Sequence, residues 1–445
     1  MKYRLDHNTF LRTFENVTVL DNQVNHVRKT VSGHDKAFVD RLTYNGFTEA
    51  TAEEATLAER LHSLWMIVAE GEKDHDFTYT DKRKTEEWFA QYDTEDSDIV
   101  PQPWLNSLEI IITSKCNERC SHCYIPNAEK DSATTLDKET VKDAIRQFRD
   151  MNGLKLNLSG GEPLLHPDIW ELLEYGRERN LMLSINSNML LLTDEMVKRL
   201  KDLRPYNIQV SLYSTQPDIH DSITNRKGSF ERTVKSIGML VSHDIPVMIS
   251  CPVMHENHNS IAGIRDYSSR LGIDCYFDYI MMAQNNGSSD NLANCLTPEE
   301  TKTAIRQIVE TDPVYMDAIK GAPSYEALMK MQFARRWSSC RIMANRICLD
   351  ADGTLFPCPG WNGMKLADIR ECRLQDVWTS SQQAAALRAV NQHEFNKCRN
   401  CSLHNFCDMC PVYNANENGS LDKVSTRFCT AAATLREVVT EIYRT

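Results

Sequence analysis

Cysteine is missing from about the first hundred residues of this chain, although the full 445 residues contain 15 cysteines. The N-terminal stretch from Met1 to His7 is polar, and no hydrophobic run approaches the length of a membrane span. We therefore expect neither a secretory signal nor a transmembrane anchor. The cysteines that follow are expected to be reduced thiols of a cytoplasmic protein, many of them bound to metal, because disulfide frameworks belong to secreted chains.

Clusters of like-charged residues are missing as well. The formal net charge of −12 is spread along the chain instead of gathering in a tail, and Lys and Arg do not cluster on one predicted helix. This pattern argues against nucleic acid as the main partner. The length leaves room for two or three domains. The informative features are the cysteines themselves, which fall into two separate patterns.

The first pattern is Cys116-Asn-Glu-Arg-Cys120-Ser-His-Cys123, which follows the apolar run Leu108–Thr113. A [4Fe–4S] cluster is held by cysteine thiolates, and a short loop can carry three of them to adjacent corners of the cluster. Three ligands leave one iron open to a small molecule with amino and carboxylate groups. A zinc knuckle would need a fourth Cys or His at matching spacing, and a chance group of buried thiols is the other alternative.

With Tyr124 as the aromatic residue after the last cysteine, this string resembles the signature loop of the radical S-adenosylmethionine (SAM) superfamily. The resemblance implies a [4Fe–4S] cluster on Cys116, Cys120 and Cys123, with SAM bound to its open iron. It also implies that Tyr124 belongs to the SAM site.

Short apolar runs alternate with amphipathic stretches from about residue 108 to 280, which is the pattern of strand–helix units on a parallel sheet. Val141, Ala144, Ile145 and Phe148 recur at helical spacing, so residues 136–151 are predicted to form a helix. The radical SAM core is a partial (β/α)6 barrel of this kind, with its chemistry at the C-terminal ends of the strands. The predicted strands are Leu108–Thr113, Leu154–Ser159, Leu181–Asn186, Ile208–Leu212, Val247–Val253 and Asp274–Tyr279.

Polar motifs stand at these strand ends. The string Ser159-Gly160-Gly161-Glu162-Pro163 resembles the GGEP-type motif that approaches the methionine amino group of SAM, although Gly-Gly and Pro also make ordinary turns. The resemblance gives SAM-binding roles to further polar residues after the third and fourth strands, where small polar residues otherwise cap turns. These residues are Asn186, Ser187, Asn188 and Ser211.

Arg226 lies in the next loop, from His220 to Phe230, which resembles the corresponding loop of peptide-modifying relatives. Many relatives use an arginine of this loop to bind the SAM carboxylate, and Arg226 is the single arginine before the following helix. Its offset from His220 differs from that of relatives, so a plain solvated charge is the alternative.

The second cysteine pattern lies near the C-terminus and resembles the seven-cysteine SPASM extension of radical SAM enzymes. Only Asp408 and Met409 precede the sixth cysteine, where relatives often have three residues. A structural zinc ribbon, whose Cys-x2-Cys pairs look similar, is the alternative. The elements of the pattern are Cys340, Gly353, Cys358, Cys398-x2-Cys401-x5-Cys407-x2-Cys410 and Cys429.

The SPASM resemblance implies two auxiliary [4Fe–4S] clusters, and hence three clusters in all. The first would be held by Cys340, Cys358 and Cys410, and the second by Cys398, Cys401, Cys407 and Cys429. The first set is one ligand short, and its last iron is either closed by a further cysteine or open to a substrate thiolate or water. The candidate fourth ligands are Cys295, Cys348 and Cys372, whereas Cys251 and Cys275 are expected to be buried thiols.

The cysteine-free N-terminal region is predicted to contain three short strands and then helices. This order resembles the winged-helix, PqqD-like peptide-recognition domain of enzymes that modify ribosomally made peptides, in which a leader peptide adds a strand to a sheet edge. Winged helices also bind DNA, but the charge pattern favours a peptide. The predicted strands are Phe10–Phe14, Val17–Leu20 and His26–Val31, and the predicted helices are Ala37–Leu42 and Ala52–Ala69, the latter with Ala55, Leu57, Leu61, Leu64 and Trp65 toward a core.

We therefore expect an α/β protein with three parts. A winged-helix-like α+β leader-recognition domain covers residues 1–100, a partial (β/α)6 radical SAM barrel covers 101–310, and a cysteine-rich SPASM domain with bridging helices covers 311–445. The whole resembles a radical SAM/SPASM maturase of ribosomally synthesised peptides.

That resemblance implies that an electron from a flavodoxin- or ferredoxin-type donor leads to cleavage of SAM into methionine and a 5′-deoxyadenosyl radical. The radical abstracts hydrogen from a precursor peptide, and the protein supplies position and exclusion of water. We expect a thioether or carbon–carbon cross-link as the product. No catalytic side chain is assigned from the sequence.

Two alternatives remain open from the sequence. An anaerobic sulfatase-maturing enzyme shares the barrel and the cysteine extension and forms formylglycine, but a folded sulfatase chain needs no leader-binding domain. A cluster-bearing binding or scaffold protein without SAM chemistry would not need the intact Cys116 loop and the Gly160-Gly161-Glu162-Pro163 motif.

Overall fold

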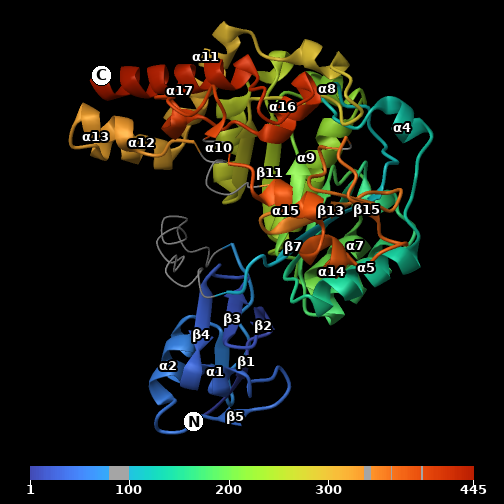
Figure 1. The fold of residues 1–445 in the computed structure, drawn as a ribbon, viewed down its shortest axis with the longest axis vertical. Helices are drawn as coiled ribbons and strands as arrows, with labels where there is room; N and C mark the ends of the chain where they lie inside the picture. The colour runs from blue at the N-terminus through green and yellow to red at the C-terminus, as the bar shows by residue number, and fades with distance from the viewer. Residues whose placement is uncertain (80–99, 335–341, 362, 392–393) are drawn as a thin grey trace.

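A nine-stranded sheet forms the centre of the computed structural model, which describes residues 1–79, 100–334, 342–361, 363–391 and 394–445 (Figure 1). The order of its strands is β12-β11-β10-β9-β8-β7-β13-β14-β15. The six strands from β7 to β12 follow one another in sequence and pair in parallel, as strand–helix units require. This confirms the predicted partial barrel.

The six barrel strands lie within two residues of their predicted bounds. Strand β7 ends in a continuous apolar run, whereas most of the other strands alternate buried apolar residues with more polar residues, several of which line a cavity inside the barrel. Their bounds are Ser107–Thr113 (β7), Lys155–Gly160 (β8), Met182–Ser187 (β9), Asn207–Ser211 (β10), Val247–Pro252 (β11) and Asp274–Asp278 (β12).

Amphipathic helices connect these strands. The helix predicted at residues 136–151 is α5, Lys138–Asp150, which buries the predicted apolar face and begins where the Asp137 carboxylate accepts a hydrogen bond from the Thr140 N–H. The other connecting helices are Asn127–Asp131 (α4), Ile169–Glu178 (α6), Asp194–Leu203 (α7), Pro217–Thr224 (α8), Ser229–Ser242 (α9) and Ile261–Leu271 (α10), with short turns of helix at Pro163–Leu165 (η2), His255–Asn257 (η3) and Asp290–Asn294 (η4).

The C-terminal region extends the barrel sheet, which the sequence analysis did not predict. Strand β13, Arg346–Leu349, pairs in parallel with β7, while β14, Thr354–Phe356, and β15, Ala367–Asp368, continue antiparallel. The barrel and this region share one continuous apolar core. The remaining elements are Pro298–Thr311 (α11), Pro313–Gly321 (α12), Tyr325–Lys330 (α13), Leu374–Thr379 (α14), Gln382–Arg388 (α15), His404–Phe406 (η6), Pro411–Asn418 (α16) and Thr426–Arg444 (α17).

Residues 1–79 form an N-terminal unit with its own apolar core (Figure 1). It has two antiparallel sheets, with strand orders β2-β3-β4 and β5-β1-β6, and two helices. The three predicted strands are present, whereas β1 and β5 were not predicted. The first helix begins and ends earlier than the predicted Ala37–Leu42 and covers Gly33–Val39. The elements are Lys2–Leu5 (β1), Thr9–Thr13 (β2), Val17–Asn22 (β3), Arg28–Ser32 (β4), Gly33–Val39 (α1), Thr48–Glu49 (β5), Ala55–Ser63 (α2) and Ile67–Ala69 (β6).

The helix predicted over Ala52–Ala69 is wrong in its last part. It ends at Ser63, and Trp65 then takes a positive φ of 60°, which a continuing helix does not allow. The β-branched pair Ile67 and Val68 pairs instead with β1. A short apolar run fits either a strand or a helix, and here pairing with a distant strand decides the outcome.

The N-terminal unit docks on the barrel at the N-terminal ends of the strands. Its fully buried Arg12 donates hydrogen bonds to the carbonyls of Gly153 (2.7 Å) and Asn180 (2.5 Å), which directly precede β8 and β9. Phe10 packs with Leu154 and Met182 in the same interface. Within the described ranges, no helix is long and apolar enough to cross a membrane.

Candidate active site

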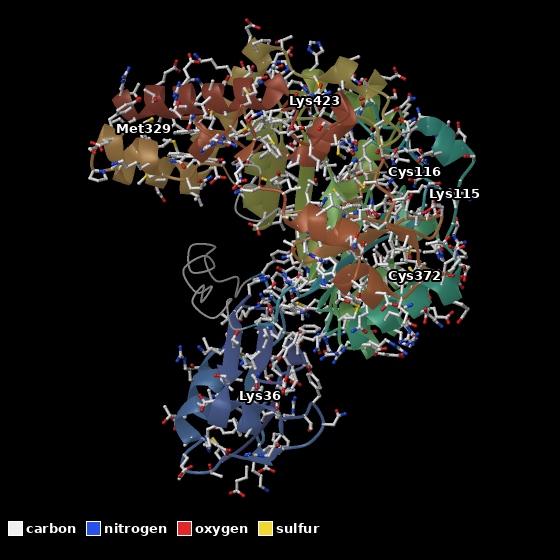
Figure 2. The ribbon with its side chains drawn as sticks, viewed as in Figure 1. Lys36, Lys115, Cys116, Met329, Cys372 and Lys423 are labelled. Atoms are coloured by element: carbon white, nitrogen blue, oxygen red, sulfur yellow. The ribbon has the colours of Figure 1, made fainter. Side chains whose placement is uncertain are left out.

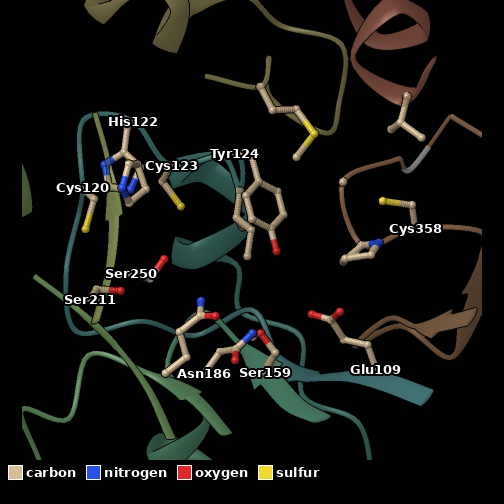
Figure 3. Close-up of a pocket in the computed structure, with 18 of the residues that line it drawn as sticks. Glu109, Cys120, His122, Cys123, Tyr124, Ser159, Asn186, Ser211, Ser250 and Cys358 are labelled. Atoms are coloured by element: carbon tan, nitrogen blue, oxygen red, sulfur yellow. The ribbon is translucent and has the colours of Figure 1, made fainter. Parts of the chain in front are cut away.

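A cavity of about 580 Å³ opens at the C-terminal ends of the barrel strands. Cys120 and Cys123 lie on one side of it, Cys358 lies on the opposite side, and Tyr124 lies between them (Figure 3). Cys116 and Cys410 also line it. Its floor consists of polar residues that point inward from successive strands, namely Glu109 on β7, Ser159 on β8, Asn186 on β9, Gln209 and Ser211 on β10 and Ser250 on β11.

Backbone hydrogen bonds to the end of α8 hold the loop that carries the first three cysteines. The N–H groups of Arg119 and Ser121 donate to the carbonyls of Thr224 (3.1 Å) and Ile223 (2.9 Å). The Arg226 guanidinium donates to the carbonyl of Asn117 in the same loop. Arg226 therefore braces the cysteine loop from behind and does not line the cavity, where a SAM carboxylate would lie.

The three thiols of this loop lie close enough to act electrostatically on one another. Burial raises the pKa of Cys116 to about 11, and the nearby Cys123 raises it further. Burial also raises the pKa of Cys120, with contributions from Glu118, Cys123 and Cys116. Such a set ionises only when positive charge compensates it, as bound iron does.

Gly160 and Gly161 allow the end of β8 to lie directly against the start of this loop. A Cβ atom at Gly160 would lie 2.3 Å from the Thr113 carbonyl oxygen, and one at Gly161 would lie 2.5 Å from the carbonyl oxygens of Ser114 and Lys115. Gly160 also has a φ of +151°, which disfavours other residues. Only glycine therefore fits at either position.

Glu162 lies fully buried behind the cavity wall. Its carboxylate accepts hydrogen bonds from the Ser187 hydroxyl (2.7 Å), the Asn188 N–H (2.8 Å) and the Leu164 N–H (3.0 Å), and burial raises its pKa to about 7. The Asn188 side chain in turn donates to Asn117 (2.6 Å). The motif thus ties the ends of β8 and β9 to the cysteine loop.

The structure brings most of the expected SAM-binding residues to the cavity. Glu162 and Pro163 lie behind the wall, with Pro163 starting η2, and Arg226 lies behind the loop. The expected residues that line the cavity are Tyr124, Gly160, Gly161, Asn186, Ser187, Asn188 and Ser211.

The C-terminal cysteines form two groups. Cys398 lies within electrostatic reach of Cys401 and Cys429, and Cys407 within reach of Cys429 and Cys398, so these four thiols gather at the start of α17. The other expected set has Cys358 and Cys410 on the cavity, while Cys340 lies outside the described residues.

The three candidate fourth ligands lie in different surroundings. Cys348 on β13 is buried and acts electrostatically on Cys358. Cys295 packs against the small apolar cluster that Cys120 also contacts, and it receives a hydrogen bond from Arg427 (3.2 Å). Cys372 lies in a surface groove between α5 and α14, away from Cys116 (Figure 2). Cys348 is therefore the best situated of the three to approach Cys358.

Several polar residues of this site were not predicted as site residues, among them Glu109, Glu118 and Lys130 and, on the floor of the cavity, Gln209 and Ser250. Glu109 points into the cavity from the floor (Figure 3). Glu118, 3% exposed, accepts hydrogen bonds from Ser229 and Asn188. Lys130 is buried beside the cysteines. Glu118 and Lys130 stand in polar stretches of sequence, and Glu118 has its partner Ser229 in a distant segment. Glu109 is a charged residue inside the apolar run Leu108–Thr113, which is a local signal that the sequence analysis did not use.

The cavity fits an iron–sulfur cluster with a bound small molecule. Three thiols share one loop, and the volume suits a ligand of nucleoside size. The buried Nδ1 of His122 in the lining has no hydrogen-bond partner among the residues that the structure describes. Among the described residues, no three His, Cys, Asp or Glu side chains form a site for a single metal ion. A multi-iron cluster spreads its ligands over several iron atoms, so the lack of a single-metal site is compatible with an iron–sulfur cluster.

Two family models match the chain. The radical SAM superfamily matches residues 110–267, and SPASM, an iron–sulfur cluster-binding domain, matches residues 340–402. A radical SAM domain binds a [4Fe–4S] cluster and SAM, and a SPASM domain binds iron–sulfur clusters.

Curated relatives are distant. The AdoMet-dependent heme synthase of Methanosarcina barkeri is 25% identical over 315 residues, which cover 67% of this chain and 89% of that protein. The PqqA peptide cyclase of Ruegeria pomeroyi is 24% identical over 314 residues, which cover 69% of this chain and 81% of that protein.

Solved structures extend the similarity to the N-terminal unit. Streptococcus suis SuiB bound to its precursor peptide SuiA has a TM-score of 0.63 at 17% identity and covers 95% of this chain and 98% of SuiB. The structure of anSMEcpe with bound AdoMet and a peptide has a TM-score of 0.57 at 15% identity and covers 76% of this chain and 98% of that one. This chain thus carries the domain of the radical SAM enzyme superfamily at residues 110–267 and a SPASM iron–sulfur cluster-binding domain at residues 340–402.

Proposed function

We propose that this protein is a maturase that cross-links a ribosomally made precursor peptide. The observation that carries the proposal is the shared cavity, which the loop of Cys116, Cys120 and Cys123 lines together with Cys358 and Cys410. A peptide segment held there would contact both cysteine groups at once. This arrangement suits a reaction in which hydrogen is removed at one side and an electron leaves at the other.

In this proposal, Cys116, Cys120 and Cys123 hold the cluster that binds SAM. When bound, the cluster and SAM supply the power to remove a hydrogen atom from an unactivated C–H bond. The chain's own residues position the reactants. Gly160 and Gly161 let β8 contact the loop, and polar groups of the floor are available to the SAM ribose and carboxylate.

We further propose three clusters in total. Cys398, Cys401, Cys407 and Cys429 would hold one auxiliary cluster, since they already gather together. Cys340, Cys358 and Cys410 would hold the other, and the position of Cys348 near Cys358 favours Cys348 as its fourth ligand. A closed auxiliary cluster passes electrons, which favours a carbon–carbon cross-link over capture of a substrate thiolate.

The N-terminal unit would bind the leader of the precursor. Strand β4 stands at an edge of the sheet β2-β3-β4, where an extended peptide can add a strand. The unit docks at the opposite end of the barrel strands from the cavity. Barrel strands of about six residues span about 20 Å, so about six or more extended peptide residues must separate the bound leader from the modified site.

Two other substrate classes compete with this proposal. One is the protein substrate of a sulfatase-maturing enzyme, the alternative that the sequence left open. The likeness to anSMEcpe, solved with bound AdoMet and a peptide, covers 76% of the chain, whereas that to SuiB covers 95% and so takes in the N-terminal unit. The heme synthase relative favours heme synthesis as the second candidate, but its match covers 67% of the chain. The proposed leader-binding role of the N-terminal unit favours peptide modification over both, and an intact cysteine loop argues against a scaffold without SAM chemistry.

The experiment is anaerobic incubation of the reconstituted enzyme with SAM, a low-potential ferredoxin- or flavodoxin-type donor of the cytoplasm, and each short peptide encoded beside the gene. The proposal expects one peptide to lose two hydrogens and to resist fragmentation between the joined residues. Loss of two hydrogens with reactivity toward hydrazide would indicate formylglycine. Conversion of a tetrapyrrole, with every peptide unchanged, would contradict the proposal.

A further inference from the structure

Helix α4, Asn127–Asp131, follows the cysteine loop and buries a single side chain, the charged Lys130. Lys130 is 4% exposed and lines the same cavity as the three thiols of the loop. A short surface helix normally buries an apolar residue, because an ammonium group loses its hydration inside a protein. The burial of this lysine therefore requires a compensating partner.

Carboxylates do not provide the main compensation. The neighbouring Asp131 is exposed and pairs with Arg119 at 2.6 Å. The groups that act most strongly on Lys130 are Cys123, then Cys116 and Cys120, and no carboxylate acts on it as strongly. Lys130 thus lines the same cavity as the three thiols that would ligate the cluster, and its ammonium group lies within their electrostatic reach.

Other cations near the loop take different positions. Arg226 binds the Asn117 carbonyl behind the loop, and Lys115 is exposed one residue before Cys116 (Figure 2). Arg346 lines the cavity from β13, which belongs to the SPASM side of the sheet. Among the cations of the described ranges that line the cavity, Lys130 is the one beside the first three cysteines.

We propose that the buried ammonium group of Lys130 offsets the negative charge of the cluster ligands Cys116, Cys120 and Cys123 and thereby raises the reduction potential of that cluster. Net charge and contacts to the sulfur atoms set the potential of iron–sulfur clusters. The step is a one-electron reduction: dithionite or the protein donor is oxidised, the cluster gains the electron, and no bond or proton is transferred. This inference rests on the proposed assignment of the cluster to these cysteines.

The test is a redox titration followed by electron paramagnetic resonance, in which the signal that changes on addition of SAM identifies this cluster. Lys130→Met removes the charge and keeps the length of the side chain, Lys130→Arg keeps the charge, and Lys115→Met removes an exposed charge beside the same loop. At a fixed potential, we expect the ratio of reduced to oxidised cluster to fall about tenfold in Lys130→Met, equivalent to about 59 mV for a one-electron couple. The other two variants should stay within about twofold of wild type.

An unchanged potential in Lys130→Met with normal iron content would overturn the inference. An unchanged potential with weaker SAM binding would also overturn it, because Lys130 would then be a contact for the SAM carboxylate. If Lys130→Met takes up too little iron, Lys130→Gln is judged by the same criteria. The titration needs no peptide, so failure to find a peptide product does not affect this test. If the wild-type signal does not change on addition of SAM, the assignment of the cluster to these cysteines is refuted.

Discussion

Buried charged groups have different partners at the two ends of the barrel strands. At the N-terminal ends, Arg12 is fully buried and its guanidinium donates to the neutral carbonyls of Gly153 and Asn180. Burial lowers the pKa of Arg12 to about 9, and no carboxylate pairs with it in the described ranges. At the C-terminal ends, thiols, carboxylates and Lys130 gather around an open cavity.

This difference distinguishes the interface around Arg12, which we call the joint, from the candidate reaction site at the cavity. The buried guanidinium is satisfied by backbone carbonyl oxygens, so these hydrogen bonds stabilise the docking of the N-terminal unit on the barrel. The cavity end instead has polar side chains that face empty space, and it has glycines where the backbone of two segments must touch. The predictions below test whether damage to one end leaves the other intact.

The largest effect is expected from removal of the first cysteine group. Changing Cys116, Cys120 and Cys123 together to Ala should abolish SAM cleavage and lower the iron content from about twelve to about eight per chain, by four irons per cluster. Iron and zinc analysis of anaerobically reconstituted protein measures this. Tightly bound zinc at the C-terminal cysteines would contradict the three-cluster account.

A large effect is also expected at the glycine contact. Gly161→Ala would push a methyl group to 2.5 Å from two backbone oxygens, so the cysteine loop must shift and SAM cleavage should fall at least tenfold. The matched control is Gly238→Ala, because Gly238 lies within α9 and has open space around its Cβ position. That control should keep activity and gain up to about 1 kcal/mol of stability. Equal losses in both variants would contradict the argument.

A smaller effect is expected at the joint. Arg12→Met leaves two buried carbonyls without their donors and should destabilise the folded chain by about 3 kcal/mol. Urea denaturation measures this, and SAM cleavage by the folded fraction should persist. Lys36→Met, which breaks a surface pair with Asp40, is the control and should change stability by less than about 0.5 kcal/mol. A loss of SAM cleavage in folded Arg12→Met would mean that the two ends are coupled.

The smallest effect is an acid-dependent loss of stability at the cavity end. His220 accepts a hydrogen bond from the Tyr213 N–H and contacts Ser229, which donates to Glu118, so it is held neutral. Burial lowers its pKa to about 4. Its contribution is therefore complete above pH 6.5 and is lost as the pH falls toward 4, by about 2 to 3 kcal/mol.

His220→Gln provides the comparison, since its side chain does not titrate. The stability of this variant, measured by urea denaturation across the same interval, should depend less on pH than that of wild type. Parallel curves for the two proteins would show that another group controls the acid response.

The barrel could be predicted from sequence because each strand has its own local signal. The apolar run Leu108–Thr113 is contiguous in sequence, and the apolar face of α5 recurs at helical spacing. Each can therefore be recognised from neighbouring residues alone. Strand β13 and the end of α2 were missed because pairing with a distant strand, and not local preference, decides their structure.

The residues of the candidate site also fall into those that could be identified from local sequence and those that could not. The cysteine loop and the two glycines could be identified from their spacing, whereas the hydrogen bond of Glu118 depends on Ser229 from a distant segment and the burial of Lys130 beside the cysteines depends on how the chain packs. The position of Arg226 behind the loop, and not in the cavity, likewise follows from the fold of α8 and the cysteine loop together.

The most direct test of the account is the response of the reduced enzyme to SAM, measured by electron paramagnetic resonance. The account predicts that SAM changes the cluster signal of the wild-type protein. It also predicts that the protein with Cys116, Cys120 and Cys123 changed to Ala keeps its C-terminal clusters but shows no change on addition of SAM. A SAM-dependent change of wild-type size in that variant would contradict the claim that the cavity at the C-terminal ends of the strands holds the SAM cluster.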